Sequence, residues 1–171
     1  LLARRMDAIL AASAELSARF ERLAGLPAGR VIPVHPGVEI GPPPAPFPKG
    51  SIKLLFVGRL EEVKGARPLA QLPEARPRWT VTAAGPGSLM EVLRCSPAVG
   101  RNLHLLGPVP PTRVRSLLDA HHLLVLPGPA PGAVRSEGLP TAVLEALAAG
   151  RPVVAGASGG ISEVLGPEDG A

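Results

Sequence analysis

The feature that most constrains the fold is a regular alternation of short apolar runs with helical patterns, separated by glycine-containing loops. The apolar runs lie at residues 52–57, 79–84, 103–106, 123–126 and 152–155. Helical patterns fill the intervals, at residues 64–72, 88–94, 112–120 and 140–149, and a last short one reaches Leu165. Strands that alternate with helices are typical of βαβ units, so the sequence predicts an α/β fold built on a parallel sheet.

Two further segments precede this alternation. Apolar residues recur at helical spacing over residues 2–24, and Ser13 is a candidate cap of a second helix whose Leu16 and Phe20 face inward. Residues 31–34 predict a short strand. The proline-rich stretch 41–48 predicts an extended surface linker.

Composition narrows the range of partners and cofactors. A net charge of +4 favours an anionic partner such as a nucleotide or a phosphate. Nucleic acid is disfavoured, because aromatic residues make up only 2% of the chain and the basic residues are scattered. The single Cys95 excludes an internal disulfide and a cysteine-based metal site, and His121 and His122 do not form a metal cluster.

The sequence shows no segment that would direct the chain to or across a membrane. No apolar run reaches the length needed to span a membrane, and no signal peptide is evident. Because the chain opens on Leu1 instead of an initiator methionine, we interpret it as a fragment.

The loops that follow the predicted strands contain the candidate binding residues. Ligands of parallel sheets bind beyond the carboxyl ends of the strands. Arg59 and Lys64 follow the first long strand and are spaced so that they can clamp a diphosphate; the alternative is a solvated pair with Glu61 or Glu62. The loop 85–87, Gly-Pro-Gly, is either a plain turn or a ligand contact.

A helix that contains one charged residue provides the next candidate. Glu145 is the only charge between Pro140 and Ala149, and its helical neighbours are small, which lets another group approach its carboxylate. Glu137 lies just before this helix. The alternative is a helix with one solvated glutamate. Free N–H groups at the helix start, near Leu139 and Pro140, favour an anion.

Two other loops leave their role open. Ser88 is a plausible cap of the helix at 88–94, with Glu91 at the capping-box position. The stretch 158–160, Ser-Gly-Gly, together with Glu163, either approaches a ligand or ends a strand and caps a helix.

Several of these segments together resemble the donor-binding, C-terminal domain of retaining GT-B glycosyltransferases of family 4, the glycosyl transferases group 1. The resemblance implies a Rossmann-like, doubly wound parallel sheet with helices on both faces, the C-terminal half of a GT-B fold. It implies that residues 1–40 are the helical tail of the acceptor-side domain and the crossover, and that 51–171 are the nucleotide-sugar-binding domain, incomplete at its C-terminal end. The matching segments are residues 7–13, 34–38, 57–60, 64–65, 84–87, 136–140, 145–146, 150–154 and 159–163.

The resemblance also implies a role for each matching residue. It places Glu145 on the ribose hydroxyls and Glu137 on the transferred sugar, and it places Arg59 and Lys64 on the diphosphate. Gly138 and Leu139 would donate backbone N–H groups to phosphate. Glu137, Arg59 and Lys64 are then the catalytic residues, and the full donor-binding set is Gly58, Arg59, Lys64, Gly85, Gly87, Glu137, Gly138, Leu139, Pro140 and Glu145.

The same resemblance implies the partners and the location. The donor is a nucleoside diphosphate sugar, no metal or other cofactor takes part, and anomeric configuration is retained. The acceptor, a glycan, lipid or small molecule, would be bound by an N-terminal domain that this chain lacks, so we expect the chain alone to be inactive. The resemblance favours a cytoplasmic enzyme and leaves room for peripheral membrane association of the full-length protein.

Two other classes of function compete with this interpretation. The first is a non-catalytic nucleotide-sugar-binding subunit or fragment that needs a separate acceptor domain. The second is a dinucleotide oxidoreductase, which is disfavoured because no Gly-x-Gly-x-x-Gly follows the first strand.

Overall fold

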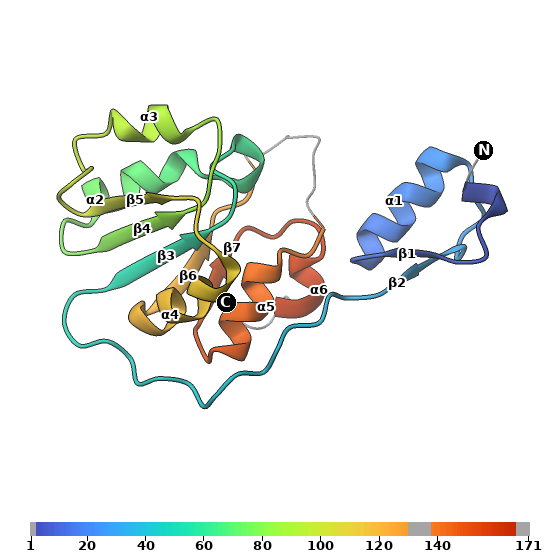
Figure 1. Ribbon diagram of the computed structural model, residues 1–171. Helices are drawn as coiled ribbons and strands as arrows, with labels where there is room; N and C mark the ends of the chain where they lie inside the picture. The colour runs from blue at the N-terminus through green and yellow to red at the C-terminus, as the bar shows by residue number, and fades with distance from the viewer. Residues whose placement is uncertain (1–2, 130–137, 167–171) are drawn as a thin grey trace. The chain divides into compact units, whose positions relative to one another are not determined.

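A five-stranded parallel sheet forms the main body of the protein (Figure 1). The computed structural model describes residues 3–129 and 138–166. The strand order is β5-β4-β3-β6-β7, and every adjacent pair is parallel. The predicted parallel sheet is therefore confirmed, with strands β3 (Lys53–Val57), β4 (Thr80–Ala84), β5 (Leu103–Gly107), β6 (Leu123–Leu126) and β7 (Val153–Ala155).

Helices connect these strands in the order expected of a doubly wound fold. The chain steps from β3 outward to β5 and then returns to lay β6 against the other side of β3. Right-handed crossovers then place α2 and α3 on one face of the sheet and α4 and α5 on the other, as Figure 1 shows. The elements are η2 (Glu62–Lys64), η3 (Arg67–Ala70), α2 (Gln71–Ala75), α3 (Met90–Arg94), α4 (Pro111–Ala120) and α5 (Thr141–Ala148).

The apolar runs of the sequence form the core because both faces of the sheet are covered. Leu55 and Phe56 of β3, Val81 of β4 and Leu124 of β6 are completely buried. A parallel sheet with helices on both faces has no solvated side, which explains why these strands are almost continuously apolar.

The start of α3 differs from the sequence prediction. The helix begins at Met90, and the residue before it, Leu89, makes no capping hydrogen bond through its side chain. Glu91 pairs with Arg94, at 2.6 Å, so the predicted capping box of Ser88 and Glu91 does not form.

The N-terminal segment is helical only in part, whereas the sequence predicts two helices over residues 2–24. It consists of η1 (Ala3–Arg5), β1 (Ile9–Ala11) and α1 (Ala14–Ala24). The prediction is wrong because β1 pairs in parallel with β2 (Val31–Pro33), a distant contact that overrides the local spacing. Ser13 does cap α1, as predicted, by accepting a hydrogen bond from the Leu16 N–H.

The face of α1 that packs inward also differs from the prediction. Phe20 is 41% exposed, whereas Ser17 and Glu21 are buried. The Glu21 carboxylate accepts a hydrogen bond of 2.8 Å from the backbone N–H of Val31, the first residue of β2. A polar contact to the neighbouring strand therefore sets the rotation of the helix.

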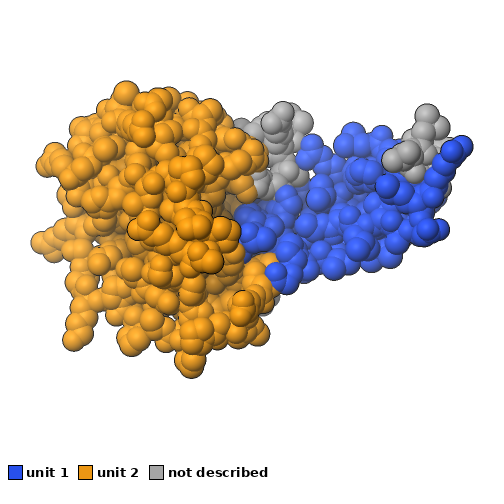
Figure 2. Space-filling view, in the orientation of Figure 1, with its two compact units in different colours: residues 1–37, 136–141, 157–171 blue, residues 38–135, 142–156 orange. Residues whose placement is uncertain are grey.

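The chain forms two compact units, coloured separately in Figure 2. One comprises residues 1–37, 136–141 and 157–171, and the other comprises residues 38–135 and 142–156. In the first unit, Glu163 of α6 (Ile161–Leu165) accepts hydrogen bonds of 3.0 Å from the N–H groups of Ala14 and Glu15. Glu163 thus caps a helix, one of the two roles open to it, although the helix is α1 and not its own.

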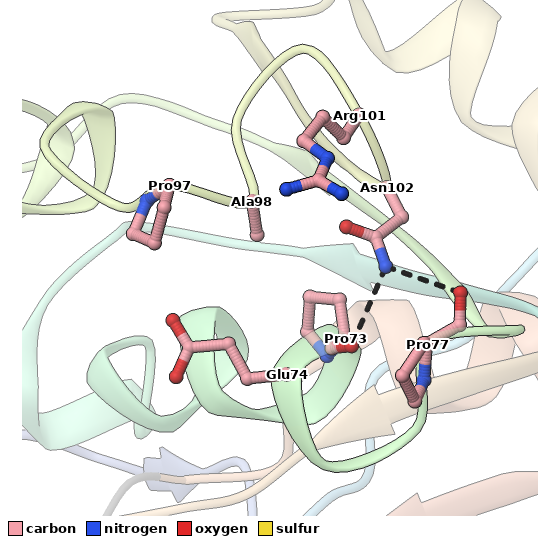
Figure 3. Close-up of a pocket in the computed structure, with 7 residues that line it drawn as sticks. All are labelled: Pro73, Glu74, Pro77, Pro97, Ala98, Arg101 and Asn102. Atoms are coloured by element: carbon pink, nitrogen blue, oxygen red, sulfur yellow. Dashed lines mark hydrogen bonds between the residues drawn. The ribbon is translucent and has the colours of Figure 1, made fainter.

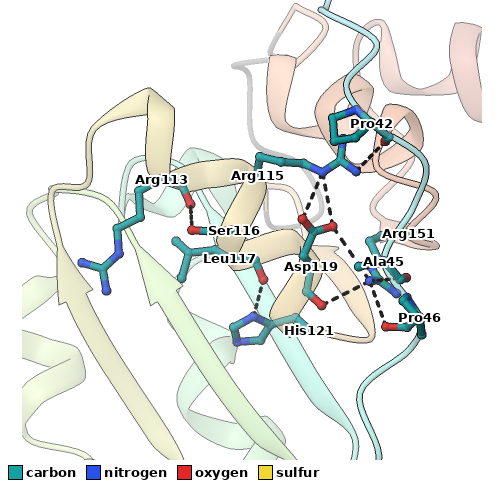
Figure 4. Close-up of polar contacts among 10 residues, drawn as sticks. All are labelled: Pro42, Ala45, Pro46, Arg113, Arg115, Ser116, Leu117, Asp119, His121 and Arg151. Atoms are coloured by element: carbon teal, nitrogen blue, oxygen red, sulfur yellow. Dashed lines mark hydrogen bonds and ion pairs between the residues drawn. The ribbon is translucent and has the colours of Figure 1, made fainter.

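In the second unit, the proline-rich linker is fastened by two arginines (Figure 4). Arg115 donates to the carbonyl of Pro42 at 3.0 Å and binds both carboxylate oxygens of Asp119 at 3.2 Å. Arg151, only 2% exposed, donates to the carbonyls of Ala45 at 2.8 Å and Asp119 at 3.1 Å. Because proline has no N–H, a proline-rich segment depends on outside donors, and these arginines supply them.

Candidate functional site

Glycines pack the loops beyond β3 and β4 directly against each other. The N–H of Gly58 donates to the carbonyl of Ala84, at 3.0 Å, and Leu60 donates to Pro86, at 2.7 Å. A Cβ atom on Gly85 would overlap the carbonyl oxygen of Gly58, and one on Gly87 would overlap the backbone of Leu60. Close packing of these two loops therefore requires glycine at both positions of the Gly-Pro-Gly turn.

The loops beyond β6 and β7 continue this packing. A Cβ atom on Gly65 would overlap the backbone of Gly128, and one on Gly156 would overlap the carbonyl of Pro127. The N–H of Gly156 also donates to Leu126, the last residue of β6, at 2.9 Å. Residues 58–65, 85–87, 127–128 and 156 thus form one strand-end rim at the carboxyl edge of the sheet, where ligands of parallel sheets bind.

The rim contains two cations, Arg59 and Lys64, and two carboxylates, Glu61 and Glu62. Arg59, whose side chain is 59% exposed, approaches both carboxylate oxygens of Glu61, at 2.9 and 3.1 Å. Lys64, at the end of η2, is half-buried, and burial is the main cause that lowers its pKa. The positive charge of Arg59 lowers this pKa further, while Glu61 opposes the shift. The two predicted cations, Arg59 and Lys64, therefore lie near each other. The alternative interpretation was a surface ion pair with Glu61 or Glu62, and the structure contains one such pair, Arg59 with Glu61.

Arg59 and Lys64 place two positive charges on one loop, and among the described residues Glu61 is the carboxylate that acts on both. Lys64 carries its charge in a partly desolvated place, where Coulomb attraction to an anion is stronger than in water. Glu62, the other candidate partner, binds Arg67 and not the rim cations. The arrangement is suited to an anion with several oxygens.

Glu145 lies in α5 four residues after the helix begins at Thr141, one residue later than predicted. Its side chain is half-buried, and burial alone raises the pKa of its carboxyl group. Over residues 3–129 and 138–166, this carboxylate makes no hydrogen bond or ion pair that would offset the cost of its burial. An acceptor of this kind is ready for hydroxyl donors from a ligand.

The residues that precede α5 were the remaining candidates. Leu139 is buried, and Gly138 and Pro140 are intermediate. The side chains of Ala12 and Leu16 lie at ordinary contact distance from where a Cβ atom on Gly138 would be, 3.7 Å. Glu137, the second predicted carboxylate, lies outside the described residues.

A separate pocket of about 380 Å³ lies near the amino ends of β4 and β5, whereas the rim lies at the carboxyl ends of the strands (Figure 3). Its walls are formed by segments that precede β4 and β5, and none of the predicted site residues contributes to it. The Asn102 amide donates to the carbonyls of Pro73 and Pro77 at 3.4 Å, so this lining residue joins two segments of the fold. The lining residues are Pro73, Glu74, Pro77, Pro97, Ala98, Arg101 and Asn102.

Two buried polar residues were not predicted from the sequence. His121 donates from Nδ1 to the carbonyl of Leu117, at 2.6 Å, and accepts at Nε2 from the hydroxyl of Thr82, at 2.8 Å. Burial lowers the pKa of His121, so the neutral ring links α4 to β4. Figure 4 shows its hydrogen bond to Leu117. The sequence shows Arg151 only as part of the segment 150–154, and nothing in it indicates that a distant linker will bury this side chain.

The described residues show neither a metal-binding cluster nor a membrane-spanning helix. They contain no group of three or more His, Cys, Asp or Glu residues arranged to hold a metal ion. No helix within them has the length and apolar character needed to cross a membrane.

The sequence of the chain matches a known protein family. The family model described as glycosyl transferases group 1 matches residues 51–171, which include the whole five-stranded sheet and the rim. The chain belongs to the glycosyl transferases group 1 family. The group 1 membership expected from the sequence motifs is therefore confirmed.

Curated relatives in this family align with most of the chain. Glycogen synthase of Mycobacterium tuberculosis is 30% identical over 174 residues, covering 96% of this chain and 41% of the relative. A putative colanic acid biosynthesis glycosyltransferase of Escherichia coli, WcaL, is 28% identical and covers 96% and 43%. The chain thus spans less than half the length of these relatives.

Solved structures show the same fold at lower identity. HepE of Anabaena, in complex with UDP and glucose, matches with a TM-score of 0.78 at 21% identity, covering 95% of this chain and 48% of that one. Sucrose-phosphate synthase of Thermosynechococcus elongatus matches with a TM-score of 0.76 at 21% identity, covering 95% and 43%. This group 1 chain therefore has the α/β, Rossmann-like fold of GT-B glycosyltransferases.

Proposed function

We propose that the chain is the nucleotide-sugar-binding part of a retaining, family 4 glycosyltransferase. The whole protein would transfer a sugar from a nucleoside diphosphate sugar to a glycan, lipid or small-molecule acceptor bound by another part of it. The observation that carries the proposal is the pair Arg59 and Lys64, held together on a glycine-packed rim at the carboxyl edge of the sheet. Membership of the group 1 family and sequence similarity to a glycogen synthase support the same proposal.

The proposed chemistry depends on charge that develops on the leaving group. When the bond between the anomeric carbon and the phosphate oxygen breaks, the electron pair goes to the diphosphate. Arg59 and Lys64 stabilise this charge, and each charge-assisted contact contributes about 1.5–3 kcal/mol. Backbone N–H groups of Gly138 and Leu139, at the start of α5, are the proposed further donors to phosphate.

The two glutamates have separate proposed roles. Glu145 accepts hydrogen bonds from the ribose hydroxyls, which accounts for a half-buried carboxylate without a partner among the described residues. Glu137 contacts the transferred sugar. Neither acts as a nucleophile in this proposal, and cations and N–H donors balance the diphosphate charge without a metal ion. We further propose a cytoplasmic location, with peripheral membrane association open to the full-length protein.

Removal of Arg59 tests the proposal. We expect the Arg59→Ala protein to bind a nucleoside diphosphate about 10- to 100-fold more weakly, while its affinity for the nucleoside stays unchanged. Arg67→Ala is the matched control, because Arg67 is similarly exposed and binds Glu62 away from the rim cations. Isothermal titration calorimetry gives both affinities. Equal losses for both ligands would indicate a structural role for Arg59 and contradict the proposal.

The alternative, a non-catalytic nucleotide-sugar-binding subunit, predicts the same binding. The two differ in the whole protein, where a catalytic role requires sugar transfer and a subunit role requires a separate acceptor domain. A transfer assay on the full-length protein, with radiolabelled nucleotide sugar, distinguishes them.

A further inference from the structure

Two adjacent glutamates lie between Arg59 and Lys64 in the sequence, and the structure gives them different partners. Glu61 binds Arg59, whereas Glu62 binds Arg67. The neighbouring positions and identical side chains make the two residues a natural comparison. Of these two glutamates, Glu61 is the one that acts on Arg59 and Lys64 of the strand-end rim.

The carboxylate of Glu61 already presents to Arg59 what a phosphate would present. Both of its oxygens lie within hydrogen-bond distance of Arg59 Nη1, at 2.9 and 3.1 Å. Its negative charge also acts on the ammonium group of Lys64. Glu61 therefore interacts with both groups to which the proposed function assigns the diphosphate.

We propose that Glu61 is a built-in competitor of the diphosphate: a nucleoside diphosphate binds by displacing the Glu61 carboxylate from Arg59, and Glu61 thereby limits the affinity. This inference rests on the proposed function. It assigns to Glu61 a role in substrate exchange that is distinct from direct contact with the sugar.

The exposure of the pair makes the exchange physically reasonable. The side chains of Arg59 and Glu61 are 59% and 31% exposed, and ion pairs in such places are weak and easily broken. A diphosphate offers more charge and more oxygens than one carboxylate, so it wins the competition. The displaced carboxylate stays near the anion and repels it, which favours release of the nucleoside diphosphate product.

The substitution Glu61→Gln removes the competing charge while it keeps the size of the side chain. We expect it to tighten the dissociation constant of a nucleoside diphosphate by about two- to five-fold and to leave the nucleoside unaffected. Glu62→Gln makes the same charge change one residue away, and we expect no change in either affinity. The probes are UDP, GDP, ADP, inorganic pyrophosphate and the corresponding nucleosides, titrated by calorimetry into the chain.

A double-mutant cycle shows whether Glu61 acts through Arg59. In the Arg59→Ala background, we expect Glu61→Gln to tighten binding by less than in the wild type, because the displaced contact is already gone. An equal effect in both backgrounds would overturn the inference in favour of general charge repulsion. Weaker binding by the Glu61→Gln single variant would show that Glu61 orients Arg59 for the ligand, and would overturn it too.

The remaining outcomes separate this inference from the proposed function. If the wild-type chain binds a nucleoside diphosphate and Glu61→Gln leaves the affinity unchanged, only the inference fails. The same holds if Glu62→Gln tightens binding as much as Glu61→Gln. If folded wild-type chain binds none of the nucleotides and no pyrophosphate, both fail.

Discussion

Glu145 allows ligand binding and stability to be separated by one substitution. Its carboxylate is half-buried, and burial raises its pKa without an opposing charge or hydrogen bond from the described residues. The free protein therefore bears a cost for keeping Glu145 ionised. We expect Glu145→Gln, which removes the charge and keeps the shape, to leave the melting temperature of the free protein unchanged or to raise it.

The pH dependence of this effect has a definite sign. A carboxyl group whose pKa is raised on folding binds more protons in the folded state than in the unfolded state, so its contribution to stability falls as pH rises. The cost is absent below the ordinary pKa of glutamate, about 4.3, and complete above the raised value. The difference in melting temperature between Glu145→Gln and the wild type should therefore be larger at pH 8 than at pH 4.

Ligand binding should change in the opposite direction. Loss of a charged acceptor from the ribose hydroxyls costs about 1–3 kcal/mol, or roughly 5- to 150-fold in the dissociation constant of a nucleoside diphosphate. Thermal melts with and without nucleotide measure both properties in one sample, because a ligand that binds only the folded state raises the melting temperature. Glu91→Gln is the control, since Glu91 is exposed and pairs with Arg94 of its own helix.

Two results would refute this reasoning. A clear drop in the melting temperature of free Glu145→Gln protein would mean that the carboxylate stabilises the fold. A ligand-induced rise equal to that of the wild type would mean that Glu145 does not contact the nucleotide.

Three further predictions concern the parts of the fold that support the site. Gly85→Ala should destabilise the protein by more than about 2 kcal/mol in urea denaturation, because its Cβ atom would overlap the Gly58 carbonyl. The same change at Gly100, which has open space around it, should cost less stability. Equal costs at the two positions would contradict the packing argument. Acidification below about pH 6.5 should destabilise the protein through His121, since its lowered pKa means that the unfolded state binds the proton more readily. This pH dependence of stability should shrink in His121→Gln. An unchanged pH profile in that variant would contradict the role of His121. Arg151→Met should cost at least about 2 kcal/mol, because linker carbonyls such as that of Ala45 lose their donor, and a neutral result would show that the linker does not depend on this arginine.

The sheet was predictable from the sequence because its signals are local. A buried parallel strand must be apolar along its length, and a glycine ends it where loops pack closely, so β3 and β6 could be found within a residue or two. The spacing of Arg59 and Lys64 likewise places both on the loop after β3, and the structure brings them together.

The features that sequence reasoning missed depend on distant partners. β1 lies within a helical pattern and becomes a strand only by pairing with β2. Glu163 caps a helix 149 residues earlier in the chain, a contact that no local motif encodes. His121 and Arg151 could not be identified as buried, because histidine and arginine are usually exposed and their burial depends on the groups that satisfy them.

Calorimetric titration of the wild-type chain with UDP, GDP and ADP tests the central claim most directly. The account predicts that at least one of the three binds with a dissociation constant below the millimolar range, and that its nucleoside binds far more weakly. A folded sample that binds none of the three at millimolar concentration would contradict the claim that this rim holds a nucleoside diphosphate.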